Sequence, residues 1–133
     1  MTREMPAFGT ETILVVDDDD RVREMGRQMI EIGGYKVLCA SSGEEALEMY
    51  TSHRVEISLI ILDLIMPGMG GSRCLEELIR IDPDVAVLVA SGYSENGLRV
   101  REQLAGARGF IRKPYDAIDI LIAIRKVLDE GNL

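Results

Sequence analysis

The stretch ILVVDDDD at residues 13–20, together with LIILD at residues 59–63, decides the fold. In each stretch, an apolar run ends abruptly at aspartate. A short β-branched apolar run predicts a strand covered on both faces, whose polar residue emerges at the carboxyl end of the sheet. That edge is where open α/β sheets bind ligands. The two stretches therefore predict that carboxylates from two buried strands meet at one edge.

Gathering carboxylates at one point is electrostatically costly. Two unit charges about 4 Å apart repel by roughly 4 kcal/mol at an effective dielectric constant near 20. A divalent cation would relieve this repulsion, so the pattern predicts a cation beside Asp17, Asp18 and Asp63. Asp17 alone could instead cap a helix. Asp19 and Asp20 are expected to be helix-start residues, because acidic groups favour the positive end of the helix dipole.

Strands and helices alternate along the rest of the chain. The apolar patterns predict strands at residues 13–16, 35–40, 57–62, 85–90 and 109–112, and helices at residues 20–32, 43–52, 72–81, 95–105 and 117–129. Ser42 and Glu45 form a capping box, and Asp116 caps the last helix. Successive βα units force parallel pairing through right-handed crossovers. The expected fold is a (βα)5 doubly wound parallel sheet in three layers.

The chain has 133 residues and a formal net charge of −8. This length predicts one domain, placed at residues 12–130. Residues 1–11 have no periodic pattern and contain Pro6 and Gly9, so they are expected to be a flexible leader or linker remnant. The negative charge argues against direct nucleic-acid binding, which needs a basic face. No run approaches the roughly 18 apolar residues of a membrane span, so a cytoplasmic protein is expected. Cys39 and Cys74 are expected to be packing residues.

Four motifs in this order, ILVVDDDD, LIILDLIMPGMGG, VLVASGY and GFIRKPYD, resemble the receiver domain of two-component response regulators. The resemblance covers residues 12–128. It implies a flavodoxin-like fold with strand order 2-1-3-4-5. It also implies that Asp63 accepts a phosphoryl group from a phosphohistidine on a sensor histidine kinase or phosphotransfer protein. Such a domain is a regulatory phosphoacceptor and not an enzyme that turns over a separate substrate.

The resemblance further implies a metal site. Asp17, Asp18, Asp63 and the backbone carbonyl of Ile65 match the family's ligands for Mg²⁺, or Mn²⁺ in its place. Such a cation prefers oxygen ligands and neutralises charge on a transferring phosphoryl group. The bond between Lys113 and Pro114 resembles the family's cis peptide.

Three other positions match the family's phosphate-binding and switch residues. Lys113 and Ser91 would bind the phosphate oxygens, and Ser91 and Phe110 would form the switch. Phe110 is expected to be part of the core as well. The readout face, for a target protein or a homodimer, would be the helix at 95–105, the strand at 109–112 and the last helix. Ile65 and Tyr93 occupy the positions that tune phosphate lifetime, and neither suits the positioning of a water molecule, so slow self-dephosphorylation is expected.

Several alternatives stay open. A haloacid-dehalogenase-like phosphatase also uses an aspartate nucleophile, but it expects a second acid where this chain has Ile65. A flavodoxin-like module would need a phosphate-cradling loop that is absent after the first strand. The sequence does not distinguish a stand-alone receiver from one attached to a hybrid kinase. In the last helix, Ile118, Leu121 and Ile122 are expected toward the outer face, which suggests a docking surface.

Overall fold

The computed structural model describes residues 8–92 and 106–130. The strands are β1 (Thr12–Val16), β2 (Lys36–Ala40), β3 (Ile57–Asp63), β4 (Val87–Ser91) and β5 (Gly109–Arg112). The helices are α1 (Asp20–Ile32), α2 (Gly43–His53), α3 (Gly70–Ile81) and α5 (Ala117–Glu130). The strands pair in parallel in the order β2-β1-β3-β4-β5, which confirms the predicted doubly wound sheet. The helix expected at residues 95–105 lies outside the described residues.

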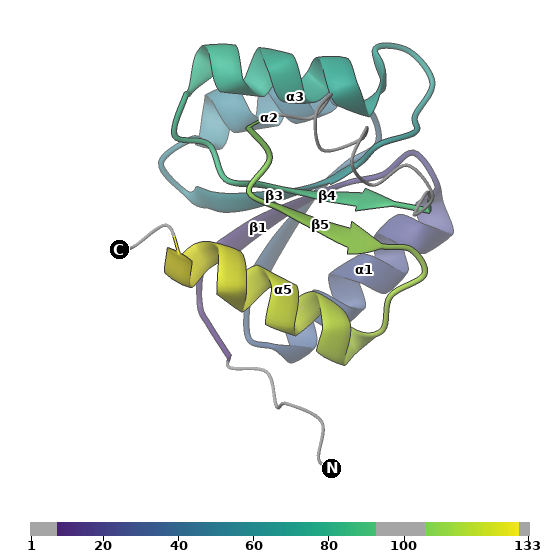
Figure 1. The fold of residues 1–133 in the computed structure, drawn as a ribbon, viewed down its shortest axis with the longest axis vertical. Coiled ribbons are helices and arrows are strands. Elements are labelled where there is room, and N and C mark those ends of the chain that lie inside the picture. Colours follow the sequence, from purple (N-terminus) through teal and green to yellow (C-terminus); the bar gives the residue numbers. More distant parts are fainter. Residues whose placement is uncertain (1–7, 93–105, 131–133) are drawn as a thin grey trace.

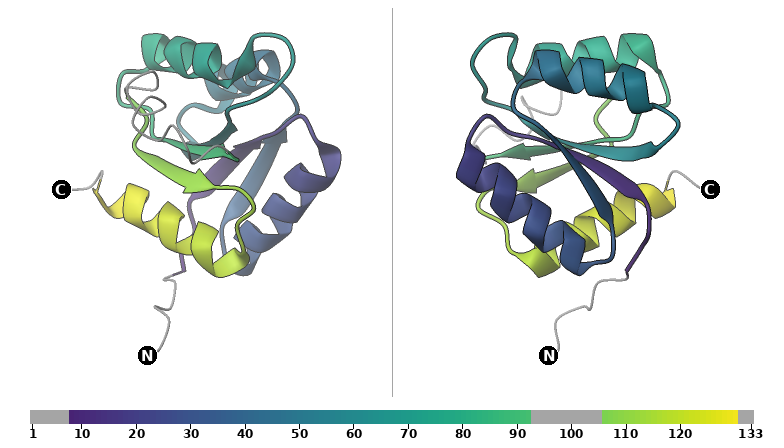
Figure 2. Two further views of the ribbon diagram at one scale, coloured as in Figure 1. Left: turned by 45° about the vertical axis from the view of Figure 1, so that its right-hand side comes forward. Right: turned by 180° about the vertical axis from the view of Figure 1, so that it is seen from behind.

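The sheet is covered on both faces, as the apolar runs predict. Helices α2 and α3 lie on one face, and α1 and α5 lie on the other (Figures 1 and 2). In β1, Leu14 and Val16 pack with the α2 and α3 side, whereas Ile13 and Val15 pack with the α1 and α5 side. Because successive side chains of a strand alternate between faces, a strand buried on both sides must be apolar throughout.

Side chains at the predicted caps begin three of the helices. The Asp19 carboxylate accepts hydrogen bonds from the Arg21 and Val22 N–H groups, and therefore caps α1. The Ser42 hydroxyl accepts from the Glu45 N–H at 3.0 Å, which confirms the expected cap of α2. Asp116 accepts from the Asp119 N–H at 2.8 Å at the start of α5.

Helix α3 begins two residues earlier than predicted. It starts at Gly70 and not at Ser72, and Met69 at its N-cap makes no side-chain hydrogen bond. The Gly71 N–H donates instead to the Leu64 carbonyl at 3.0 Å. The backbone next to the end of β3 thus takes the place of a capping side chain, which a cap-based prediction misses.

The buried face of α5 is wider than its sequence pattern predicts. Leu121 is 2% exposed, so its expected place near the outer face is wrong. Helix α5 contacts α1 as well as the sheet, and the Leu121 side chain lies directly against Gly33 at the end of α1. Ile118 and Ile122 are half-buried.

Phe110 is 37% exposed, which contradicts its expected place in the core. It lies on β5, the edge strand of the sheet. The neighbouring Ile111 packs toward the α1 and α5 side, and a strand's pleat sends adjacent side chains to opposite faces. The Phe110 side chain therefore lies on the face opposite to Ile111 and is partly exposed to solvent.

The described part of the expected leader is tied to the domain. The Gly9 N–H donates to the Gly33 carbonyl at 3.1 Å. The Arg125 guanidinium on α5 donates to both carboxylate oxygens of Glu11, at 2.9 and 3.1 Å. These hydrogen bonds outweigh the effect of burial and hold the pKa of Glu11 below its usual value. Residues 8–11 are thus joined to both α1 and α5.

Both cysteines are free, and they lie where the sequence predicts, Cys39 in β2 and Cys74 in α3. Burial raises the pKa of the Cys74 thiol to about 12, which makes it unreactive at neutral pH. Among the described residues, no helix is both long and apolar enough to cross a membrane.

Candidate functional site

The carboxyl edge of the sheet brings the predicted polar residues together. Asp17 follows β1, Asp63 and Ser91 end β3 and β4, and Lys113 follows β5. Asp17, Asp63 and Ser91 are each less than 9% exposed, whereas Asp18 is exposed. Because all the strands are parallel, their carboxyl ends share one edge, so residues far apart in sequence become neighbours.

Three carboxylates converge at this edge. Asp17, Asp18 and Asp63 each offer an oxygen atom, and these atoms all lie within 4.8 Å of one another. Several carboxylate oxygens at this spacing are the donor set that a hard divalent cation prefers. The chemistry of the residues present therefore fits Mg²⁺ or Mn²⁺, as expected from the sequence. The Ile65 side chain is 56% exposed at the same edge.

Lys113 bridges two of the carboxylates. Its Nζ lies 2.7 Å from Asp17 Oδ2 and 3.2 Å from Asp63 Oδ1. The Lys113 N–H donates to the Ser91 carbonyl at 2.8 Å, and this places the lysine beside the end of β4. The peptide bond between Lys113 and Pro114 is cis, which confirms the expectation.

The charges of this cluster are mutually dependent. Burial raises the pKa of Asp63 above its usual value. The Lys113 ammonium lowers this pKa in part, and the nearby Asp17 carboxylate raises it further. Burial alone would lower the pKa of Lys113, but hydrogen bonding and attraction to Asp17 and Asp63 raise it instead. Lys113 is therefore held as a cation between two carboxylates, while Asp63 ionises less readily than an ordinary aspartate. A further cation at this point would favour that ionised form.

This geometry has a counterpart in a known family. The sequence profile described as the response regulator receiver domain matches residues 13–125. The chain belongs to the response regulator receiver domain family. The phosphatase and flavin-binding alternatives are thereby set aside in favour of the receiver fold. Receiver domains are regulatory switches of two-component signalling that interact with histidine kinases and phosphotransfer proteins.

Relatives of different overall size contain a similar domain. The sensor kinase CckA of Brucella abortus is 34% identical over 123 residues, which span 92% of this chain but 13% of CckA. The chemotaxis protein CheY of Thermotoga maritima is 33% identical over 116 residues, which span 86% of this chain and 95% of CheY. The CheX–CheY–BeF3–Mg complex of Borrelia burgdorferi has a TM-score of 0.82 and 30% identity, and covers 88% of each chain.

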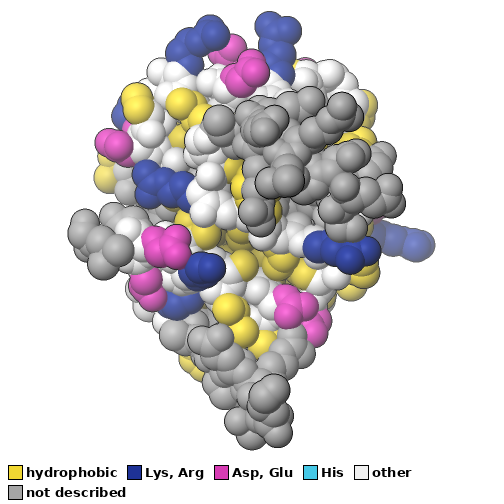
Figure 3. Space-filling view, viewed as in Figure 1, with side chains coloured by type: hydrophobic (Ala, Val, Ile, Leu, Met, Phe, Trp, Pro, Cys, Tyr) yellow, Lys and Arg dark blue, Asp and Glu magenta, His cyan; other side chains and the backbone are white. Residues whose placement is uncertain are grey.

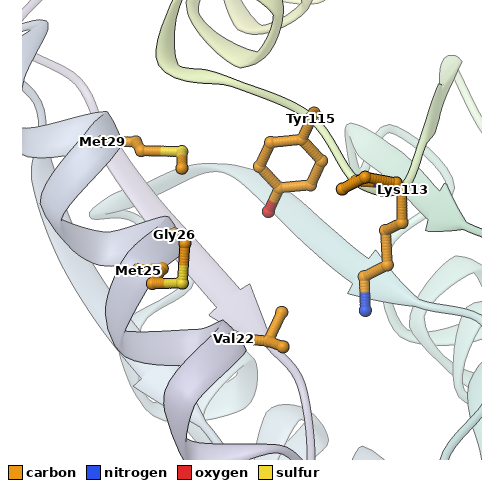
Figure 4. A pocket seen from close by; sticks show the side chains of 7 residues that line it. Val22, Met25, Gly26, Met29, Lys113 and Tyr115 are labelled. Carbon is orange, nitrogen blue, oxygen red and sulfur yellow. The ribbon is translucent and has the colours of Figure 1, made fainter.

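An apolar pocket lies beside the carboxylates of this receiver domain. It has a volume of about 390 Å³, and it is lined by Val22, Met25, Gly26, Met29, Lys113, Pro114 and Tyr115. Figure 4 shows the side chains of α1 facing Tyr115 and Lys113 across the pocket. Met25 is 55% exposed, because it lines this pocket and is not part of the core.

One residue of the site was not identified from the sequence. The Arg23 Nη1 atom, in the first turn of α1, donates to the backbone carbonyl of Asp17 at 2.8 Å. A cation near the start of a helix is unfavourable with respect to the helix dipole. An arginine in the first turn of a helix therefore indicates that a nearby acceptor compensates its charge. The sequence alone does not show which acceptor this is. Tyr93 lies outside the described residues.

Proposed function

We propose that this receiver domain accepts a phosphoryl group on Asp63 from a phosphohistidine of a sensor histidine kinase or phosphotransfer protein. The observation that carries the proposal is the convergence of the Asp17, Asp18 and Asp63 oxygens within 4.8 Å of one another, next to the Lys113 ammonium. The relative crystallised as a CheX–CheY complex with BeF3 and Mg supports it. The proposal includes a cytoplasmic location and no direct contact with nucleic acid.

The transfer needs a carboxylate nucleophile and compensation of negative charge. A carboxylate oxygen of Asp63 forms a bond to phosphorus, the bond from phosphorus to the imidazole nitrogen breaks, and its electron pair stays on the imidazole. Lys113 Nζ, 3.2 Å from Asp63 Oδ1, is placed to donate to a phosphoryl oxygen. The Ser91 hydroxyl, at the end of the adjacent strand β4, would donate to another.

The acidic residues would hold Mg²⁺, or Mn²⁺ in its place. Asp17, Asp18, Asp63 and the carbonyl of Ile65 are the proposed ligands. When bound, the cation would neutralise charge on the transferring group. The cation would also lower the pKa of Asp63, against the effect of burial, because a positive charge beside it favours the carboxylate.

Incubation with acetyl phosphate and MgCl2, followed by intact-protein mass spectrometry, tests the proposal. We expect one phosphoryl adduct per chain, which EDTA prevents. Continuous release of inorganic phosphate without an adduct would instead indicate a phosphatase. No adduct at saturating acetyl phosphate and Mg²⁺ would contradict the phosphoacceptor role.

We further propose that the phosphorylated domain loses its phosphoryl group slowly. Ile65 is 56% exposed next to the site, and its side chain has no group that can orient an attacking water molecule. We expect Ile65→Asn to shorten the half-life of the phosphorylated domain about tenfold, because an amide can position that water. Ile32→Asn, at a side chain 67% exposed on α1, is the control and should change nothing. A wild-type half-life of seconds, unaffected by Ile65→Asn, would contradict slow dephosphorylation.

The proposed readout face includes β5 and α5. Figure 3 shows hydrophobic side chains exposed in the region of these two elements, between Lys or Arg and Asp or Glu groups. Phe110 and Ile122 both line a surface hollow there. In the proposed switch, phosphorylation draws the Ser91 hydroxyl toward the phosphate, and Phe110 moves inward from its exposed position.

Glutamate substitutions on α5 test whether this face is an interface. We expect Ile118→Glu combined with Ile122→Glu to weaken self-association of the phosphorylated domain, or its binding to a target, at least tenfold, because each glutamate would be desolvated in the contact. Val55→Glu, at a fully exposed site between α2 and β3, is the control. Analytical ultracentrifugation with and without acetyl phosphate gives the measurement, together with binding to the kinase. Unchanged association with both would exclude the face as an interface.

A further inference from the structure

Hydrogen bonds hold the backbone on both sides of Asp17, in the peptide unit that precedes it and in the unit that joins it to Asp18. The Asp17 N–H donates to the Ala40 carbonyl at the end of β2, at 3.1 Å. The Asp17 carbonyl accepts from Arg23 Nη1 at 2.8 Å. This carbonyl and the Asp18 N–H belong to one planar peptide unit. The guanidinium of Arg23 therefore limits how that unit can rotate.

Arg23 is held in place by a second contact. Its Nη2 atom donates to the Asp20 carboxylate, so one planar guanidinium joins two groups of the loop and helix start. The Arg23 side chain is 19% exposed and lies against the loop. A lysine offers a single ammonium centre and cannot reproduce this planar pair of donors.

The two acidic residues before α1 differ in what holds their carboxylates. Asp17 accepts from the Asp19 N–H at 3.0 Å and from Lys113 Nζ at 2.7 Å. Among the described residues, the exposed Asp18 carboxylate has no such hydrogen bond. The direction of the Asp18 side chain therefore depends on its own backbone, which begins at the peptide unit that Arg23 holds.

We propose that Arg23 is a positioning residue, which orients the peptide unit between Asp17 and Asp18 so that the Asp18 carboxylate meets those of Asp17 and Asp63. The inference rests on the proposed divalent-cation site. It assigns Arg23 no contact with the cation or with the phosphoryl group. Its effect passes through the backbone.

The direction in which the affinity for a divalent cation changes when Arg23 is replaced distinguishes a positioning role from a purely electrostatic one. Arg23 is a cation near the carboxylates, so its removal would by electrostatics alone tighten the binding of a divalent cation. Loss of positioning acts in the opposite direction, because Asp18 then spends less time at the site. Changes in such indirect supports of metal ligands typically cost about 10 to 100-fold in affinity.

The test is a titration with MnCl2, followed by the electron paramagnetic resonance signal of free Mn²⁺, in the absence of a phosphodonor. We expect Arg23→Met to raise the Kd for Mn²⁺ roughly tenfold. Arg23→Lys keeps the charge and one donor, and should recover part of the affinity. Arg27→Met is the matched control, since Arg27 lies one turn further along α1 and, within residues 8–92 and 106–130, pairs with Glu24 and Glu31. It should leave the Kd within about twofold, because a surface ion pair contributes little.

A second readout needs no metal. In the metal-free protein, we expect the amide resonance of Asp18 to shift in Arg23→Met and Arg23→Lys but not in Arg27→Met. Affinity in Arg23→Met equal to or tighter than in the wild type would overturn the inference. If Arg23→Met does not fold, Arg23→Lys is compared with Arg27→Lys, and equal affinities overturn it. Failure of the wild type itself to bind Mn²⁺ and accept a phosphoryl group would contradict the proposed function instead.

Discussion

Asp63→Asn is expected to abolish the phosphoryl adduct that acetyl phosphate and Mg²⁺ leave on the wild-type domain. An amide is not the anionic nucleophile that attack on phosphorus needs, and it is a poorer ligand for a divalent cation. The fold should persist. Because burial raises the pKa of Asp63 in the folded state, ionisation of this carboxyl opposes folding above its unfolded pKa.

The pH dependence of stability provides an independent check on Asp63→Asn. The wild type should gain stability relative to the variant as the pH falls from neutral through the raised folded pKa of Asp63, since protonation removes the buried charge. Asp84→Asn, at an exposed turn between α3 and β4, is the control and should keep the adduct. An adduct of unchanged yield on Asp63→Asn would place the acceptor on another residue.

Gly71→Ala is expected to destabilise the domain by about 3 kcal/mol, at the upper end of the usual cost of overpacking. A Cβ at this position would lie 2.4 Å from the Asp63 carbonyl oxygen and 2.6 Å from the Leu64 Cα. These are backbone atoms of the end of β3, which cannot move aside as a flexible side chain can. Helix α3 would have to shift away from the strand that carries Asp63, so phosphorylation should slow as well.

The matched control for this variant is Gly26→Ala in α1. There the nearest atoms to a new Cβ are Tyr115 Oη at 3.4 Å and Val15 Cγ1 at 3.7 Å, which are ordinary contacts. We expect Gly26→Ala to stabilise the domain by up to about 1 kcal/mol, because alanine is the better helix former. Urea unfolding followed by circular dichroism compares the two. Equal stability of Gly71→Ala and the wild type would mean that α3 and β3 do not approach each other this closely.

Much of the fold could be predicted because its local signals agree. The apolar runs before Asp17 and Asp63 predict strands covered on both faces and form them, and the caps at Ser42 and Asp116 begin helices where expected. The side chains gathered at the carboxyl edge follow from parallel pairing alone. The strand order came from the resemblance to receivers, since local patterns do not specify which strands are neighbours.

The predictions that failed depended on contacts between elements distant in sequence. Leu121 is buried because α5 packs against α1 as well as the sheet. The apolar periodicity of a helix does not show how many other elements pack against it, or on which sides. Phe110 is 37% exposed on β5, whereas the neighbouring Ile111 packs against the core. The start of α3 is set by a backbone hydrogen bond to Leu64, which no side-chain pattern records.

The sequence by itself determined the elements, their parallel pairing and the acidic residues that end two of the strands. Buried β-branched runs and caps act within a few residues, so they can be read from the chain. Only the tertiary structure decided how the carboxylates are held: Lys113 lies between Asp17 and Asp63, and Arg23 binds the peptide unit between Asp17 and Asp18. These contacts depend on the pairing of β5 with β4, which brings Lys113 to the carboxyl edge, and on the packing of α1 against β1. A side chain's partner is set by what the fold brings beside it.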